Sequence, residues 1–395
     1  MDPADLALAP AASGERPAPR RLSAARRASR AHFAALGVMG GVWGVHIPSV
    51  KVQYGLSDGS LSLVLFAAAC GAVLSLFFAG RAIGRIGARR ALVGGALVMA
   101  AALAVVLHWP GLAALLPAML VFGAAMSMYD VALNAEGTAL EAVSGRAILG
   151  NLHGMFSLGG MGGAALAALL LRLAVPPAVQ LVAISLVVAV VVVVAARSML
   201  DAHPQDDHPG EAAHFVWPRG RLLIIGLLIF AGMTAEGVMY DWSVLYLKQE
   251  LGLPQAQAGV GFAVFSAAMA AARFSGDALR ARVNEPSLLF AGAVMAGVAM
   301  AALLLIGHPW VALVGYALVG IGLALVVPIL FNAATKVQGV SRAAAIAAVS
   351  SIGYSGFLVG PPLIGGVAQA VSLTAAMSLV VVAMVALAVG ARRVG

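Results

Sequence analysis

Positive charge is distributed very unevenly along this chain. Twelve apolar stretches can be marked on it, and all but three of its 24 Lys and Arg residues fall before the first stretch, after the last, or in every second connection. The three exceptions are Lys51, Arg172 and Lys248. Because short loops rich in Lys and Arg stay on the cytoplasmic side of a membrane, this pattern predicts an even number of membrane spans with both termini in the cytoplasm.

Composition favours the same class of protein. The chain is 62% hydrophobic and 10% charged, with a mean hydropathy of +0.99, far from the balance of soluble domains. Each apolar stretch has about 19 to 28 residues, enough to cross a hydrocarbon core of roughly 30 Å as a helix. The stretches are too long for barrel strands and lack their alternation. We therefore predict an all-α integral membrane protein of the cell inner (plasma) membrane, with helices near residues 31–53, 59–80, 90–108, 111–138, 146–172, 177–199, 220–247, 256–278, 287–307, 309–334, 343–370 and 372–391.

The second half of the chain repeats features of the first. Asn134 matches Asn332, and Ser157 matches Ser355, both at an offset of 198 residues (332 minus 134, and 355 minus 157). A period of half the length is typical of transporters built from two six-helix bundles. The predicted organisation is a disordered basic cytoplasmic tail (1–30), an N-terminal bundle (31–199), a cytoplasmic linker (200–219) and a C-terminal bundle (220–391). Asp and His residues of the linker could hold a metal, but linker composition explains them better, so neither a metal nor a cofactor is expected.

The connection between the second and third stretches carries a recognisable motif. It runs from Gly80 to Arg90 and resembles the cytoplasmic signature of the major facilitator superfamily, with Gly84 in place of the usual acid. Together with the blocks around Asp130 and Gly353, it is similar to the YbjJ-type branch, a relative of the fucose-permease group. The resemblance implies a transporter without specifying a substrate. It also implies a cytoplasmic gate formed by Gly80, Arg85, Gly87, Arg89, Arg90, Glu136, Arg273 and Asp277, in which Glu136 is expected to pair with Arg85, and Asp277 with Arg273 or Arg280.

Ionisable side chains at membrane depth indicate where a solute could bind. Each costs at least ~2.5 kcal/mol to insert and therefore normally faces a cavity or a partner. Glu236 lies near the middle of its stretch, and Asp130 and Asn134, four residues apart, share one helix face. Each candidate also has a structural alternative, such as a buried hydrogen bond for Glu236, a local bond near Pro48 for His46, or interface anchoring for the aromatic residues. The predicted substrate or proton site comprises Glu236, Tyr240, Asp241, Asp130, Asn134, His153, His46, Trp43, Asn332 and Tyr354.

The charged residues of these stretches limit the class of solute that we predict. No Lys or Arg is expected in the middle third of any stretch, and Arg273 is placed nearer the cytoplasmic end. A bound anion would normally need such a base, so a small neutral or cationic solute is favoured. Carboxylates that lack a counter-charge could exchange protons, which predicts proton coupling. The formal charge of +8 is expected to face an anionic inner leaflet rather than nucleic acid, and the protein is expected to be a monomer.

Two other function classes remain open at this stage. A transporter fold can serve a membrane sensor that moves no solute, because a fold does not dictate a function. The sequence Gly353-Tyr354-Ser355-Gly356 has the form found in intramembrane serine proteases, but Ser355 has the repeat mate Ser157, which favours a structural origin. We therefore expect a secondary transporter rather than an enzyme. No nucleotide-binding loop is expected to supply ATP chemistry.

Overall fold

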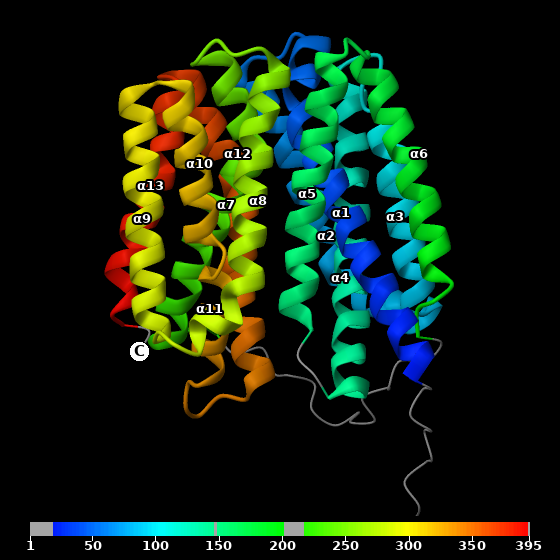
Figure 1. Ribbon diagram of the computed structural model, residues 1–395, viewed down its shortest axis with the longest axis vertical. Helices are drawn as coiled ribbons and strands as arrows, with labels where there is room; N and C mark the ends of the chain where they lie inside the picture. Colours follow the sequence, from blue (N-terminus) through cyan, green and yellow to red (C-terminus); the bar gives the residue numbers. More distant parts are fainter. Residues whose placement is uncertain (1–18, 146–147, 201–216, 394–395) are drawn as a thin grey trace, which may run out of the picture.

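The chain folds into two bundles of roughly parallel helices. The computed structural model describes residues 19–145, 148–200 and 217–393. Helices α1 to α6 form one group and α7 to α13 the other; the helices run along the long axis, and the two groups lie side by side across it (Figure 1). We call the first group the N half and the second the C half. Their helices are α1 Pro19–Gln53, α2 Asp58–Ile86, α3 Ala88–Ala104, α4 Leu112–Ser144, α5 Leu149–Arg172, α6 Pro177–Ala196, α7 Arg221–Gln249, α8 Gln255–Arg280, α9 Glu285–Ile306, α10 Pro309–Leu323, α11 Val326–Thr335, α12 Arg342–Ala370 and α13 Leu373–Ala391.

Besides shifts of up to six residues at other helix ends, such as those of α2 and α4, two differences from the sequence prediction change the extent or the number of the helices. Helix α1 begins at Pro19, inside the predicted disordered tail, and the rest of that tail (1–18) lies outside the described residues. The predicted stretch 309–334 is divided into α10 and α11 by a turn at Ala324 and Leu325. Pro328 explains the division, because it has no N–H to donate to the carbonyl of Ala324 and its ring crowds that carbonyl.

Most of the helices can span a membrane. Eleven helical stretches of the described residues are long and apolar enough, with α10 and α11 counted as one stretch. Helix α3, with 17 residues, is shorter than these eleven. Every described secondary-structure element is a helix or a turn, so the predicted all-α membrane class is confirmed.

Within each half, helices distant in sequence pack together. In the N half α1 lies against α5, and α2 against α4; in the C half α7 lies against α12, and α9 against α10 and α13. The α1–α5 contact is especially close, because a Cβ on Gly37 would overlap the carbonyl oxygen of Phe156 and one on Gly159 would overlap that of Ala34. Only glycine allows the two backbones to approach so closely.

The two halves meet through α5 with α8, α2 with α12, and α1 with α7 and α8. The start of α1 and the end of α13 lie at the same end of the molecule, the lower one in Figure 1. We call it the termini end. The opposite end, where α1 turns into α2 and α7 into α8, is the far end.

Candidate functional site

Arg273 joins the two halves near the centre of the helices. Its guanidinium donates through Nη2 to Glu236 Oε1 on α7 at 3.0 Å and through Nη1 to Ser157 Oγ on α5 at 2.8 Å. The side chains of Arg273 and Glu236 are only 14% and 13% exposed. A guanidinium suits this position because it carries several donors in a fixed plane and can serve two partners at once. We call Arg273, Glu236 and Ser157 the central bridge.

The central bridge corrects the prediction for Arg273. The sequence placed this residue toward the cytoplasmic end, paired with Asp277, and left Glu236 without a counter-charge. Because side chains on a helix tilt toward its N-terminus, the long arm of Arg273 extends from the later part of α8 back toward the middle of the bundle. The predicted absence of a base at this depth is therefore wrong. The side chain of Asp277 lies outside the described part of the structure.

Two other predicted residues lie beside the central bridge. Tyr240, one turn after Glu236, and His153, one turn before Ser157, are both near enough to interact with the charge of Arg273. The Tyr240 ring packs edge-on against Phe262 at 5.2 Å between centroids, and its hydroxyl is buried with no hydrogen-bond partner. An unpaired buried hydroxyl costs free energy unless a bound molecule or water satisfies it. Tyr240 is therefore a member of this group whose polar atom is left without a partner.

Asp130, Asn134 and Tyr354 form a second group. Asn134 Nδ2 donates to the backbone oxygen of Asp130 at 2.9 Å and to its Oδ1 at 3.2 Å. Tyr354 comes from α12 of the C half and lies near enough to feel the charge of Asp130 on α4. The structure thus brings these three predicted residues together from both halves.

His46 and Trp43 lie closer to the far end and have structural partners. His46 is fully buried, with Nε2 at 3.2 Å from Gln180 Oε1 and Nδ1 at 3.3 Å from Ser49 Oγ. Trp43 is 8% exposed and packs on Phe122 at 5.5 Å between ring centroids. Both residues thus have structural contacts, but not the predicted ones: His46 bonds two side chains rather than a carbonyl freed by Pro48, and Trp43 packs inside the bundle rather than at the membrane interface.

Asn332 does not join the central bridge. Its Nδ2 donates to both carboxylate oxygens of Glu285 at 2.9 Å, at the start of α9. Arg280 also pairs with Glu285, and Lys336 Nζ lies 3.3 Å from Glu285 Oε2. We call these four residues the Glu285 cluster. The prediction that placed Asn332 near Glu236 is wrong, and Arg280, one of the two predicted partners of Asp277, is bound to Glu285.

Two predicted gate residues of the N half, Arg89 and Glu136, bind the backbone just after α6, at Met199 and Leu200. Gly87 ends α2 with a φ of 85°, a conformation that favours glycine. Arg89 Nη2 donates to the Met199 oxygen at 3.0 Å, and the Leu200 N–H donates to Glu136 Oε1 at 3.1 Å. Glu136 is fully buried whereas Arg85 is exposed. The two side chains therefore do not share the environment that their predicted pairing requires. Gly80, Gly84 and Arg90 are exposed as well.

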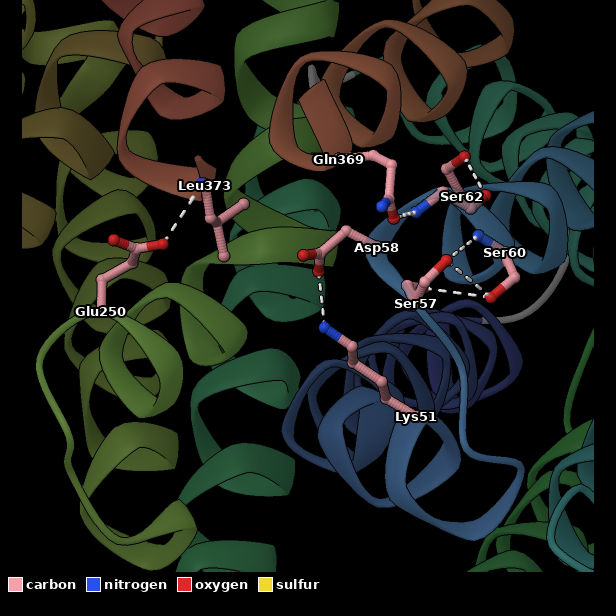
Figure 2. Close-up of polar contacts among 9 residues, drawn as sticks. Lys51, Ser57, Asp58, Ser60, Ser62, Glu250, Gln369 and Leu373 are labelled. Atoms are coloured by element: carbon pink, nitrogen blue, oxygen red, sulfur yellow. Dashed lines mark hydrogen bonds and ion pairs between the residues drawn. The ribbon is translucent and has the colours of Figure 1, made fainter. Parts of the chain in front are cut away.

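The far end is closed by polar contacts between the halves. The Gly59 N–H donates to Gln369 Oε1 at 3.1 Å (Figure 2). Gln255 Nε2 donates to the Val45 oxygen at 2.8 Å and to Ser49 Oγ at 2.7 Å. Lys51, by contrast, pairs with Asp58 at 2.6 Å inside the N half (Figure 2). These contacts, and those of Gly365 with Ser62, fix α12 and α8 against α1 and α2.

Two helical halves that meet at a central bridge are an arrangement found in membrane transporters. Known proteins support this class. The family model described as Major Facilitator Superfamily matches residues 31–361. The chain therefore belongs to the Major Facilitator Superfamily. Ser355, the predicted protease alternative, donates to the Ile352 oxygen of its own helix, and membership in this family makes the chain a transporter rather than an enzyme.

Relatives and solved structures agree with the family. An uncharacterized MFS-type transporter of Yersinia pestis is 35% identical over 368 residues, covering 93% of this chain and 94% of its own. The membrane protein MosC of Rhizobium meliloti is 31% identical and covers 87% of this chain and 84% of its own. The fold is similar to that of the Escherichia coli fucose:proton symporter FucP, with a TM-score of 0.65 at 17% identity, and of the nucleoside transporter NupG, with a TM-score of 0.74 at 12% identity. These alignments cover 94% and 95% of this chain, respectively, and 98% of each neighbour.

Proposed function

We propose that this chain is a proton-coupled transporter of a small neutral or cationic solute. It would work by alternating access, with the two halves rocking about the central bridge and the Asp130 group. We further propose that it crosses the inner membrane twelve times, with α3 as the twelfth span and both termini in the cytoplasm.

The central bridge is the observation that carries the coupling. Glu236 holds Arg273 in place, and Arg273 in turn holds Ser157 of the other half. A proton on Glu236 would remove the charge that binds the guanidinium, weakening a charge-assisted hydrogen bond by roughly 1.5–3 kcal/mol. The coupling free energy between two sites of a protein is typically about 1–3 kcal/mol, so a loss of this size can link proton binding to the movement of the halves. Protonation of one carboxylate can thus change how firmly the halves hold each other.

The charges of the central residues support the solute class. Arg273 is balanced by Glu236, while Asp130 and Asp241 have no ion pair among the described residues. An anionic solute would meet uncompensated carboxylates, whereas a neutral or cationic solute would not be repelled. The neighbouring fold of a fucose:proton symporter lends support to both a neutral solute and proton coupling.

Glu236→Gln tests the coupling in reconstituted vesicles. Fucose, uridine and choline are first compared by their effect on the Tm of the purified protein, and whichever raises it is used as the labelled probe. The variant keeps hydrogen-bonding capacity but cannot titrate. Accumulation driven by a pH gradient should fall about tenfold or more, because the lost charge-assisted bond is worth roughly 1.5–3 kcal/mol, whereas exchange at equal pH should persist.

The double variant Glu236→Gln/Arg273→Gln is the matched control. It removes both charges, so it should relieve any instability of an unpaired guanidinium while leaving coupling lost. Wild-type gradient dependence in Glu236→Gln would falsify the coupling role. Binding of a probe without flux in the wild-type protein would instead identify the non-transporting sensor.

The topology has its own test. A reporter fused after Arg393 should be cytoplasmic, and cysteines introduced at Gly111 and His308 should react with an impermeant reagent added from outside. The free Cys70 is first replaced by Ala so that it does not contribute. Reversal of either result would reject the twelve-span arrangement.

A further inference from the structure

Equivalent lysines of the two halves have different partners at the far end. Lys51 lies in the last turn of α1 and Lys248 in the last turn of α7, at an offset of 197 residues (248 minus 51). Each has a polar partner seven residues further on. Lys51 pairs with the acid Asp58 at 2.6 Å (Figure 2), whereas Lys248 Nζ donates to the neutral amide oxygen of Gln255 at 3.0 Å. Among the described residues, Lys248 therefore has no acidic partner.

The positive charge of Lys248 is left without compensation. The residue is half-buried at the end of a membrane-spanning helix, where an ammonium group loses part of its hydration. Gln255 accepts one of the three ammonium N–H groups but carries no charge. The dipole of α7 stabilises a cation at the helix C-terminus in part, yet Lys51 has the same advantage at the end of α1 and still pairs with an acid. Lys248 thus lacks the counter-charge that its repeat mate has.

A cavity of about 450 Å³ lies beside Lys248. Small-molecule sites in proteins typically have roughly 300–1,000 Å³. Lys248 and Gln255 supply its wall from the C half, and residues of the N half, among them Gln53 and His108, supply the rest. None of the described residues that line it is acidic. We call it the far-end cavity, and a molecule bound in it would contact both halves.

The lining combines hydrogen-bond donors with an apolar surface. Two N–H groups of Lys248 remain for a ligand, and the exposed side chains of Gln53 and His108 can each donate another. Val52, which is 71% exposed, and Pro177 present carbon atoms to the same space. One ammonium balances one negative charge, and its hydrogen bonds to a carboxylate are among the stronger polar contacts. This lining fits a small organic molecule with one carboxylate and an apolar body.

We propose that the far-end cavity binds a small organic monocarboxylate, whose carboxylate pairs with Lys248 as Asp58 pairs with Lys51. Because its walls come from both halves, the bound molecule stabilises the closed far end and slows its opening. The site goes beyond the proposed function. The solute proposed there is neutral or cationic, and the far-end cavity shares no residue with the central bridge.

The binding test measures the Tm of the full chain in detergent while sodium phenylbutyrate replaces NaCl at constant ionic strength and pH. A ligand that binds only the native state stabilises it, so phenylbutyrate at ten times its Kd should raise the Tm by about 2 °C. Phenylbutanol and phenylbutylamine carry the same apolar body with a neutral or a cationic head, and neither should produce this rise. A rise with phenylbutanol equal to that with phenylbutyrate would overturn the proposal.

Matched variants test the role of Lys248. Lys248→Gln should abolish the Tm rise, Lys248→Arg should keep it, and Lys51→Gln, the same change at the repeat mate, should keep it as well. Gln255→Glu supplies the acid that the C half lacks, so the phenylbutyrate concentration for half of the rise should increase about tenfold or more. Glu236→Gln should bind normally, which separates this site from the proposed coupling.

A second measurement tests the effect on closure. A cysteine placed at Gly59 in a Cys70→Ala background lies outside the lining of the far-end cavity, so its labelling by an impermeant thiol reagent reports opening rather than shielding. Phenylbutyrate at ten times its Kd should slow labelling about tenfold, and Lys248→Gln should remove that effect. Unchanged labelling despite binding would overturn the closing role.

Three further results would overturn the site itself. The first is a wild-type Tm that does not respond to phenylbutyrate, and the second is a Lys248→Gln variant that responds like the wild type. The third is a Tm rise that depends on Lys248 with added phosphatidylglycerol but is absent with phenylbutyrate, because the cavity would then take a lipid headgroup rather than a soluble carboxylate.

Discussion

The far end and the termini end are held together by different interactions. At the far end, hydrogen bonds of Gln369 and Gln255 cross from one half to the other, and α12 approaches α2 closely at Gly365. At the termini end, the ionic Glu285 cluster lies wholly within the C half. At these two ends the ion pairs lie within a half, Lys51 with Asp58 at the far end and the Glu285 cluster at the termini end, whereas the hydrogen bonds of Gln369 and Gln255 that join the halves at the far end are between neutral groups.

The kind of contact at each end determines how the halves can separate. Van der Waals contacts lose about a quarter to a half of their energy within roughly 0.5–1 Å of displacement, and neutral hydrogen bonds weaken over a similar range, so the far end can open abruptly. Ion pairs act over longer distances and resist partial separation. With its ion pairs inside one half, the Glu285 cluster can stay intact while the halves move.

The largest expected effect comes from Gly365→Leu. A side chain at this position would overlap Ser62, so the far end could not close. A cysteine placed at Gly59 in a Cys70→Ala background should then react with an impermeant thiol reagent about tenfold faster or more, since overpacking costs about 1–3 kcal/mol. Gly366→Leu is the matched control, because a side chain there meets nothing within 4 Å. Equal labelling rates in the two variants would mean that Gly365 does not seal the far end.

A smaller effect is expected from Glu285→Gln. The change removes the ion pairs with Arg280 and Lys336 while keeping an oxygen for Asn332. Stability should fall by about 1–2 kcal/mol, measured as a lower Tm, while labelling at the far end should stay within about twofold of wild type. The control is Glu250→Gln, whose described partners are the Leu373 N–H and the Thr374 hydroxyl and which should lose less stability. A marked change in far-end labelling would contradict a cluster confined to one half.

The smallest effect is expected from Gln369→Ala. It deletes one neutral hydrogen bond between the halves, worth about 1 kcal/mol, so labelling of the cysteine at Gly59 should accelerate about fivefold. Gln369→Glu keeps an oxygen acceptor for the Gly59 N–H and should restore most of the wild-type rate. If alanine and glutamate behave alike, the hydrogen bond does not contribute to closure.

Much of the fold was predictable from sequence because the membrane imposes strong rules. Apolar stretches of spanning length have to be helices, and eleven described stretches meet that expectation. The break before α11 could have been predicted as well, since Pro328 stands inside a predicted helix, in its last third. The helical start at Pro19 was missed because hydropathy marks the buried part of a helix and gives no signal for its charged extension.

The candidate site was predictable only in part. Glu236 and Asp130 stood out because carboxylates are rare in apolar helices, but their partners depend on the packing between helices. The partner of Arg273 could not be read from spacing, because the guanidinium lies far from its own backbone. Asn332 was misplaced for a related reason. Repeat symmetry relates it to Asn134, which bonds within its own helix, whereas Asn332 bonds Glu285 at the start of α9. The best sequence signal for the Glu285 cluster was Asn284, a helix-capping residue directly before the acid Glu285.

The close α1–α5 contact also has a consequence for how the protein is made. In the folded chain 83% of the most apolar part of α1 is buried, the largest share of any span. Yet α1 is the first of the described helices to be synthesised, and the start of α5 follows its end by 96 residues (149 minus 53). At about 5–20 residues per second, α1 waits roughly 5–20 s for the helix that covers its glycine face. During that interval lipid or an insertion factor has to shield Gly37, so a delay in inserting α5 should expose the nascent chain to proteolysis even when every central side chain is intact.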